Sequence, residues 1–408
     1  MAAEPAGHLL ELVRSGQART RSDLQVVTGL SRSTVTSRVD DLVSAGFLRE
    51  RGVVRSPRGR PSIVLEFNEQ HGVVLAADLG ATHARAAVCD LGGRSLAERR
   101  HTLRIAGGPQ TVLGWVERTW RELLTTAGVA QESVLGLAAS VPGPVDVATG
   151  RTVHPPIMPG WHDYPIRERL ENAFGVPGFV DNDANAMAFG EYHAGTLSCS
   201  SLLFVKVATG IGAGMVVDGR LVRGADGGAG DIGHVRLGHP DSGPLCACGA
   251  RGCLAASASG GAIARQLREQ HLSADTSRAA VRLAQAGDPR AIALVRESGL
   301  LIGEVLATAV SLLNPRALVV GGDLVRAQDH FMGALRERLY QRTQPLATRH
   351  LQVVTSSLGD RAGVLGAARL VVEQLFGAEA VNAALAGTGR LTPTGRPGRE
   401  ATPADGRQ

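Results

Sequence analysis

Residues 73–89, VVLAADLGATHARAAVC, decide the fold of the larger part of this chain. The apolar run 73–77 predicts a buried strand, and the run from Ala84 to Cys89 predicts a second strand that returns beside it. The turn between them carries a carboxylate at Asp78, a glycine at Gly80 and a hydroxyl at Thr82. A turn of this kind can bring backbone amides close to a phosphate, because glycine leaves the approach open. We therefore expect a strand, a phosphate-sized turn and a returning strand.

The same pattern, an apolar run that leads into a glycine-containing turn, occurs twice further along the chain. Residues 202–207 form an apolar run that enters Ala208-Thr209-Gly210, and residues 318–320 enter Gly321-Gly322-Asp323. Strand-turn-strand units of this kind resemble the opening of the actin-like ATPase (ribonuclease H-like) fold. The sequence thus predicts an α/β protein with two lobes, each with its own phosphate turn. The candidate nucleotide-phosphate residues are Asp78, Gly80, Thr82, Thr209, Gly210, Gly321 and Gly322.

A histidine and three cysteines lie within twenty residues of a chain that has five cysteines in all. They are His234, Cys246, Cys248 and Cys253. Four nitrogen and sulfur ligands at this spacing are typical of a closed zinc site, in which no position is open to water, so the zinc is expected to be structural. The alternative is three buried or redox-active cysteines in a loop.

The cysteine loop, the run Gly227-Gly228-Ala-Gly230-Asp231-Ile-Gly233-His234 and the run 209–214 together resemble the ROK family of sugar kinases and sugar-responsive repressors. The resemblance covers about residues 71 to 375. It implies that His234 and the three cysteines hold zinc and that the same histidine helps to hold a sugar.

The resemblance also implies a sugar site around residues 180–185. Asp183 would take the proton from a sugar hydroxyl in a kinase, Asn182 would bind the neighbouring hydroxyl, and the loop at Gly143 would close over the ring. Without that context, an aspartate between two asparagines is equally typical of a turn or a helix cap. The implied ligand-binding residues are Gly143, Asn182, Asp183, Asp231 and His234.

Several positions depart from the kinase pattern. Ala81 and Ala208 place methyl groups in the phosphate turns, and His83 stands where a lysine is common. Asp231 is one methylene shorter than the usual glutamate, and Ala255 replaces another sugar-binding glutamate. These changes predict weak phosphate binding and a ligand that differs from an ordinary hexose.

Residues 7–67 follow a different pattern. Residues 8–14 place apolar side chains on one helical face, Thr20 can cap a second helix, Gly29 can form a turn, and Ser31 can cap a third helix that runs to Ser44. This order is the plan of a helix-turn-helix unit. The outer face of the third helix can donate to phosphates and base edges. The residues predicted to bind DNA there are Ser31, Arg32, Ser33, Thr36, Ser37 and Arg38.

Two apolar runs, 47–48 and 63–65, bracket a polar loop and predict a β-hairpin wing. Its tip holds Arg58, Gly59 and Arg60 between two prolines, which resembles the core of an AT-hook that lies in a narrow minor groove. A tip that touches only phosphates is the alternative. Both interpretations predict binding to double-stranded DNA, whereas a three-helix interaction module would not bind it.

The composition is that of an ordinary globular protein, with 408 residues, 44% hydrophobic and 20% charged. No segment approaches the roughly 18 consecutive apolar residues of a membrane helix, and the first thirty residues lack the pattern of a secretory signal. We therefore expect a cytoplasmic protein without a membrane partner, in which Cys89 and Cys199 are reduced and buried. Lys206 is the only lysine, which we interpret mostly as coding bias.

The expected domain organisation follows from these patterns. Residues 1–70 form a winged helix-turn-helix, 71–182 the first lobe, completed by 359–377, and 183–358 the second lobe with the zinc loop. Few large apolar residues follow Gly377, so 386–408 is expected to be a disordered tail.

The sequence as a whole predicts a DNA-binding transcriptional regulator, a repressor, whose ROK-like domain senses a sugar or sugar derivative. It would bind operator DNA as a dimer or tetramer, because a helix-turn-helix reads paired half-sites. The first alternative is an ATP-dependent sugar kinase with a fused DNA-binding unit, in which Asp183 is the base and ATP with Mg²⁺ is the cosubstrate. The second is an architectural DNA-binding protein whose lobes bind nothing.

Overall fold

The computed structural model describes the chain except residues 1–4, 55–61, 198, 239–241, 389–390 and 392–408. Its N-terminal unit is a winged helix-turn-helix, as expected. Thr20 and Ser31 cap the second and third helices, accepting from the backbone N–H groups of Asp23 and Thr34, and Gly29 is left-handed. The elements are α1 (Ala6–Arg14), α2 (Arg21–Thr28), α3 (Arg32–Ser44) and the antiparallel strands β1 (Leu48–Val54) and β2 (Ser62–Phe67).

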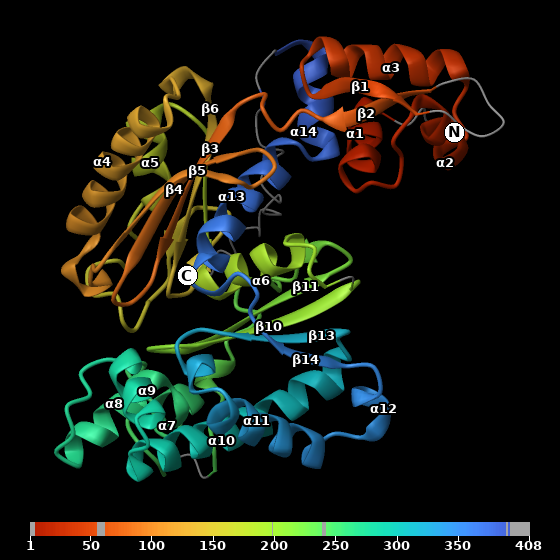
Figure 1. The fold of residues 1–408 in the computed structure, drawn as a ribbon. Helices are drawn as coiled ribbons and strands as arrows, with labels where there is room; N and C mark the ends of the chain where they lie inside the picture. The colour runs from red at the N-terminus through yellow and green to blue at the C-terminus, as the bar shows by residue number, and fades with distance from the viewer. Residues whose placement is uncertain (1–4, 55–61, 198, 239–241, 389–390, 392–408) are drawn as a thin grey trace, which may run out of the picture.

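The first lobe is a five-stranded sheet in the order β5-β4-β3-β6-β9. Alternate residues of β3 serve opposite faces: Leu75 joins a core with α4, whereas Val74 joins a core with α13. Helices therefore cover both faces of the sheet (Figure 1). The elements are β3 (Val73–Leu79), β4 (Ala84–Asp90), β5 (Ser95–His101), β6 (Val134–Val141), β9 (Gly178–Asn182), α4 (Pro109–Ala127), α5 (Ile166–Phe174) and α13 (Ala362–Leu375).

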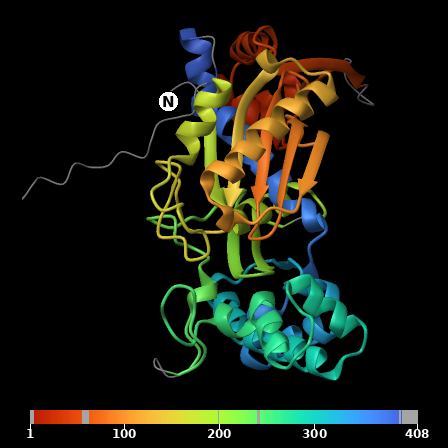
Figure 2. The ribbon, with the colours of Figure 1, turned by 90° about the vertical axis from the view of Figure 1, so that its left-hand side faces the viewer.

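The second lobe is a five-stranded sheet in the order β12-β11-β10-β13-β14. Most of its helices gather at the end of the molecule away from the N-terminal unit (Figures 1 and 2). The strands are β10 (Ser201–Val207), β11 (Ile211–Val217), β12 (Arg220–Leu221), β13 (Ala317–Gly321) and β14 (Gln352–Thr355). The helices are α7 (Leu254–Ala258), α8 (Gly260–Glu269), α9 (Ser277–Gln285), α10 (Pro289–Leu313), α11 (Asp329–Arg342) and α12 (Pro345–Thr348).

Helix α6 (Asp183–His193) lies between the two sheets, where it contacts β10, β11 and α13. The contact with α13 is very close, because a Cβ at Gly366 would lie 1.7 Å from the Ala186 carbonyl oxygen and one at Gly190 would lie 2.4 Å from that of Ala362. Near its C-terminus, Glu191 accepts from the Ser357 hydroxyl at 2.8 Å and the Leu358 N–H at 2.9 Å. The helix thus fixes the segment that leads from β14 into α13.

Residues 378–388 are helical, contrary to the expectation that too few apolar residues remain after Gly377 to fold. Helix α14 (Ala378–Ala383) continues as a helical turn, Ala384–Thr388, into the first residues of the predicted tail. Val381 and Ala384 are buried with residues of α1, which supplies the apolar partner that the local sequence lacks. The rest of the predicted tail lies outside the described residues, apart from Leu391.

The C-terminal helices join the N-terminal unit to the first lobe. Arg14 of α1 donates to the Phe376 carbonyl at 2.9 Å and pairs with Glu373 at 2.9 Å, and the Ala378 N–H donates to Glu11 at 3.1 Å. The Phe376 ring packs edge-on against Phe47 and Phe67, at centroid distances of 5.6 and 5.1 Å. We call these contacts the head junction. It couples the N-terminal unit to α13, and α13 runs back to the sheet of the first lobe.

Among the described residues, no helix combines the length and apolarity that a membrane crossing requires.

Candidate functional site

The centre of the candidate site is an ion pair between Asp183 and Lys206. Asp183 is the first residue of α6, and Lys206 lies on β10 beside Gly212 on one neighbouring strand and Gly321 on the other. The Lys206 ammonium donates to Asp183 Oδ2, and the two side chains are 14% and 6% exposed. The residue predicted as a catalytic base is therefore held by a cation that the sequence analysis did not assign to the site.

Electrostatics favour the charged form of this lysine. Burial lowers the pKa of Lys206, but the carboxylates of Asp183 and Asp78 outweigh burial and raise the pKa above its ordinary value. Burial acts in the opposite sense on Asp183, where it raises the pKa and the ammonium only partly offsets it. We assign the pair as ionic at neutral pH, because a buried ammonium needs a charged partner and this one faces two carboxylates.

Asp78 brings the end of the first sheet to the same place. It accepts a hydrogen bond of 2.8 Å from the buried Ser140 hydroxyl on β6. The predicted phosphate turn that follows is closed by its own Gly80 N–H, which donates to the His83 carbonyl at 2.8 Å. A Cβ at Gly80 would lie 2.5 Å from the His83 ring. Burial lowers the pKa of His83, so this ring is neutral at physiological pH. It does not supply the cation that a lysine would give to a phosphate.

Asn182 acts as a helix cap, which is one of the alternative roles given above for the polar residues at 182–185. Its Oδ1 accepts from the Ala184 N–H at 2.9 Å, and its Nδ2 donates to the Gly143 carbonyl at 3.1 Å. The structure thereby brings Gly143, Asn182 and Asp183 together, as the resemblance implied. Both polar atoms of Asn182 nevertheless already have backbone partners.

A second ion pair beneath this cap was not anticipated from the sequence. The buried Asp181 forms an ion pair with Arg223 at 2.8 Å and accepts a hydrogen bond of 2.9 Å from Asn185 Nδ2. Arg223 begins the glycine-rich segment that leads to Asp231, so the pair fixes that segment against the end of β9. No local motif marks the two residues, which are 42 positions apart.

The two predicted phosphate turns of the second lobe lie side by side. A Cβ at Gly322 would lie 2.4 Å from the Val207 carbonyl oxygen, which places the turn at Gly321 and Gly322 against the one at Thr209 and Gly210. Asp323, the next residue, pairs with Arg278 at 2.8 Å, and Arg278 also pairs with Asp360 at 3.0 Å. The acid beside this turn is thus already neutralised by an arginine.

The four predicted zinc ligands converge. One ligand atom from each of His234, Cys246, Cys248 and Cys253 lies within 4.8 Å of the others. His234 Nδ1 and Cys246 Sγ are 3.7 Å apart, and so are the sulfurs of Cys248 and Cys253. A tetrahedral zinc with Zn–S bonds of about 2.3 Å requires ligand separations of about 3.8 Å, so the residues fit the ion. The other ring nitrogen, Nε2, is 4.0 Å from Asp231 Oδ1. Zinc on Nδ1 would therefore leave Nε2 and Asp231 as a pair.

Strand β11 connects the zinc loop to α6. Gly233 and Gly230 lie against it so closely that a Cβ would be 2.3 Å from the Ile211 carbonyl oxygen or 2.1 Å from that of Ala213. On the same strand, a Cβ at Gly214 would be 2.5 Å from the Ala184 carbonyl oxygen. His234 and Asp183 are therefore held on elements that pack on one strand.

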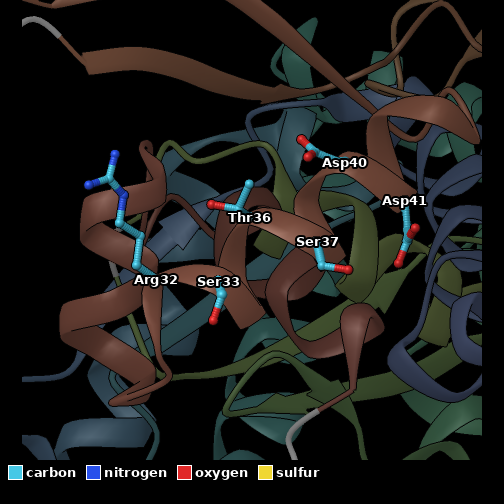
Figure 3. Close-up of a pocket in the computed structure, with 6 residues that line it drawn as sticks. All are labelled: Arg32, Ser33, Thr36, Ser37, Asp40 and Asp41. Carbon is cyan, nitrogen blue, oxygen red and sulfur yellow. The ribbon is translucent and has the colours of Figure 1, made fainter.

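The predicted DNA-binding face lies on α3. Arg32, Ser33, Thr36, Ser37, Asp40 and Asp41 line a shallow hollow along the helix (Figure 3). Asp40 pairs with Arg21 at 2.5 Å, which neutralises one of the two acids. Ser31, Arg32, Ser33 and Ser37 are exposed, and Thr36 and Arg38 are partly buried. The tip residues Arg58, Gly59 and Arg60 lie outside the described residues.

Comparison with known proteins gives a family match over most of the chain. The model of the ROK family matches residues 74–374. The putative xylose repressor of Caldicellulosiruptor sp. is 29% identical in an alignment of 382 residues that covers 90% of this chain and 95% of the relative.

Two solved structures are similar to the chain over different extents. The ROK family transcriptional regulator described as a homologue of the E. coli MLC protein has a TM-score of 0.78 and 24% identity, and the alignment covers 94% of this chain and 98% of that one. The ROK family glucokinase of Streptomyces griseus, in complex with glucose and AMPPNP, has a TM-score of 0.62 and 29% identity, covering 73% of this chain and 99% of that one. The regulators match nearly the whole chain, whereas the kinase leaves about a quarter of it unmatched.

Proposed function

This chain belongs to the ROK family, and from that premise we propose that it is a sugar-responsive transcriptional repressor. The observation that carries the proposal is the head junction, because it joins a winged helix-turn-helix to the sugar-kinase-type lobes through buried contacts. The xylose repressor matches 90% of the chain, a span that must reach beyond the ROK domain. The repressor would act on operator DNA in the cytoplasm.

The sugar would bind around Asp183, with Asp231 and His234 completing the site. Asp183 accepts from a hydroxyl, and the Nε2 atom of His234 faces the sugar side because Nδ1 faces the cysteines. When bound, zinc fixes the orientation of this imidazole. The role of the metal is structural, since all four of its positions are taken by protein ligands.

Sugar binding would reach the DNA through α6 and α13. Asp183 begins α6, α6 packs against α13 at Gly190 and Gly366, and α13 ends at the head junction. A change in the angle between the lobes would then move the reading helix α3 in each subunit of a dimer or tetramer. A sugar that favours one angle shifts the population of operator-binding molecules.

A sugar kinase is the second candidate, because the glucokinase structure matches the lobes and Asp183 can act as the base that the resemblance implies. The ion pairs of Asp183 with Lys206 and of Asp323 with Arg278 weigh against it, since each occupies an acid beside a predicted phosphate turn.

Calorimetry of the zinc-loaded protein with D-xylose, D-glucose, their phosphates and ATP separates the two functions. The repressor binds a sugar without ATP, and Asp183→Ala loses that binding. Binding of ATP together with the appearance of sugar phosphate would instead make the protein a kinase. Failure to bind any of these ligands would refute sugar sensing for these sugars.

A further inference from the structure

Lys206 is exceptional in this chain. Of the 43 lysine and arginine residues, it is the single lysine. A chain that uses arginine at every other basic position keeps a lysine at the one place where a base-like aspartate needs a partner. Arginine has a broad, planar head, whereas the ammonium of lysine is compact and has three rotatable donors. The position therefore calls for a small point charge with donors to spare.

No side chain stands directly opposite Lys206 on the sheet. The residues directly opposite Lys206 on the two neighbouring strands are Gly212 and Gly321, and neither carries a side chain. In a sheet, opposite residues on one face are the closest lateral neighbours of a side chain. The Phe204 ring fills the place that a side chain at Gly321 would take, and Ala184 lies against Gly212, so the Lys206 stem is enclosed. Its ammonium still contacts Asp183 Oδ2, so a ligand that binds Asp183 lies next to the ammonium as well.

The donors of the ammonium are only partly used. Asp183 is the one hydrogen-bond partner found for Nζ within the described part of the chain. An ammonium carries three donor hydrogens and a carboxylate accepts several hydrogen bonds, so each partner can bind a further group. Such a pair offers an acceptor and a donor side by side, which matches two adjacent hydroxyls: one donates to the carboxylate, and the oxygen of the other accepts from the ammonium.

We propose that Lys206 is a sugar-contacting residue which, with Asp183, binds two adjacent hydroxyl groups and so selects neutral, unphosphorylated sugars. This inference rests on the proposed function and names the class of its effector. Lys206 also occupies Asp183 Oδ2, so the carboxylate is a hydrogen-bond acceptor for the sugar and not a free base.

The charges around the pair favour a neutral ligand over a phosphate. Asp78 and Asp183 contribute two carboxylates against the one ammonium. His83 is neutral, and Arg278 is already paired with two acids, Asp323 and Asp360. A phosphate that approached this group would meet uncompensated negative charge, whereas a neutral hydroxyl pair would not.

The test is calorimetry with the full-length, zinc-loaded wild type and Lys206→Met. The ligands are D-xylose and D-glucose, glucose 6-phosphate, and the monodeoxy derivatives of the sugar that binds. Wild type should bind the neutral sugar and lose about 10- to 100-fold in affinity when the hydroxyl that meets Lys206 is removed, as for a lost hydrogen bond to a charged group. Lys206→Met should bind the parent sugar more weakly by a similar factor and should no longer discriminate at that position.

Two further variants keep the test decisive. Lys206→Met leaves Asp183 buried without its partner, so the neutral double variant Lys206→Met with Asp183→Asn is measured as well, and its melting temperature verifies folding. Arg278→Met removes another partly buried cation that pairs with an aspartate, and it should keep the wild-type pattern among the deoxy sugars.

The outcomes separate the two hypotheses. If wild type binds the sugar and Lys206→Met shows the same deoxy pattern, the role of Lys206 is wrong and sugar sensing stands. Preference for glucose 6-phosphate over glucose would overturn the ligand class. If wild type binds neither neutral sugar, the proposed function fails for these sugars, and this inference fails with it.

Discussion

Replacing Phe376 by alanine should disconnect sugar binding from DNA binding. The Phe376 ring is fully buried at the end of α13, where it meets Phe47 and Phe67 of the N-terminal unit and His71 of the connecting segment. Truncating a buried phenylalanine costs about 3–5 kcal/mol, and the loss of two edge-to-face contacts falls within that figure. The variant should therefore melt at a lower temperature, with the loss concentrated at the head junction.

The matched control is Phe174→Ala. Phe174 is 5% exposed and packs edge-on against Trp120 at 5.5 Å, in the core of the first lobe away from the head junction. Its truncation should cost a similar free energy of unfolding. Only Phe376→Ala should also bring the ratio of the operator affinity without sugar to that with sugar close to one. The reason is that the N-terminal unit no longer moves with α13.

The assay is fluorescence anisotropy of a labelled operator at fixed salt, with sugar binding measured in parallel by calorimetry. Phe376→Ala should keep its sugar affinity within a few fold. A wild-type ratio of operator affinities in Phe376→Ala would refute transmission through the junction. So would equal losses of that ratio in both variants, since these would trace the effect to general destabilisation.

Three further predictions follow from other parts of the structure. Cys253→Ser should lower the zinc content of dialysed protein and abolish sugar binding, whereas Cys89→Ser, at a buried cysteine of the first sheet, should change neither; intact sugar binding without zinc would contradict the positioning role of the metal. Arg32→Ala should weaken DNA binding and reduce the slope of log affinity against log salt by about 1, as for one lost phosphate contact, and an unchanged slope would remove Arg32 from the interface. Burial lowers the pKa of His193 from 6.5 to about 4, so the folded state favours the neutral ring. The free energy of unfolding should therefore be highest above pH 6.5 and should decrease as the pH falls toward 4, because the unfolded chain takes up the proton first. This decrease in the free energy of unfolding should be about 3 kcal/mol. In urea denaturation, the free energy of unfolding of His193→Phe should depend less on pH between 6.5 and 4; the same pH dependence as wild type would exclude His193 as the cause.

Much of the fold could be predicted from sequence because its signals are local. The caps at Thr20 and Ser31, the turn at Gly29 and the strand-turn-strand at 73–89 each depend on neighbours within a few residues. The zinc ligands were equally accessible, since their spacing along the chain specifies the loop.

What could not be predicted depends on contacts between distant segments. The folding of α14 requires the apolar face of α1, more than 360 residues away, and no property of residues 378–388 announces that partner. Arg278 and Asp323 are joined in the same way, across 45 positions.

The pairing of Lys206 with Asp183 had one available signal. Lys206 was visible as the only lysine, and its place on a strand that ends in a predicted phosphate turn could have located it in the candidate site. Its partner could not be identified, because the contact depends on how α6 crosses β10.

The most direct test of the repressor proposal is an operator titration with and without sugar. A duplex selected from random sequence by the full-length, zinc-loaded protein provides the operator, and its affinity is measured at one salt concentration with saturating D-xylose or D-glucose. The account predicts that the sugar which binds in calorimetry weakens operator binding at least tenfold, and that Asp183→Ala removes this response. An operator affinity that stays the same when that sugar saturates its site would contradict the account.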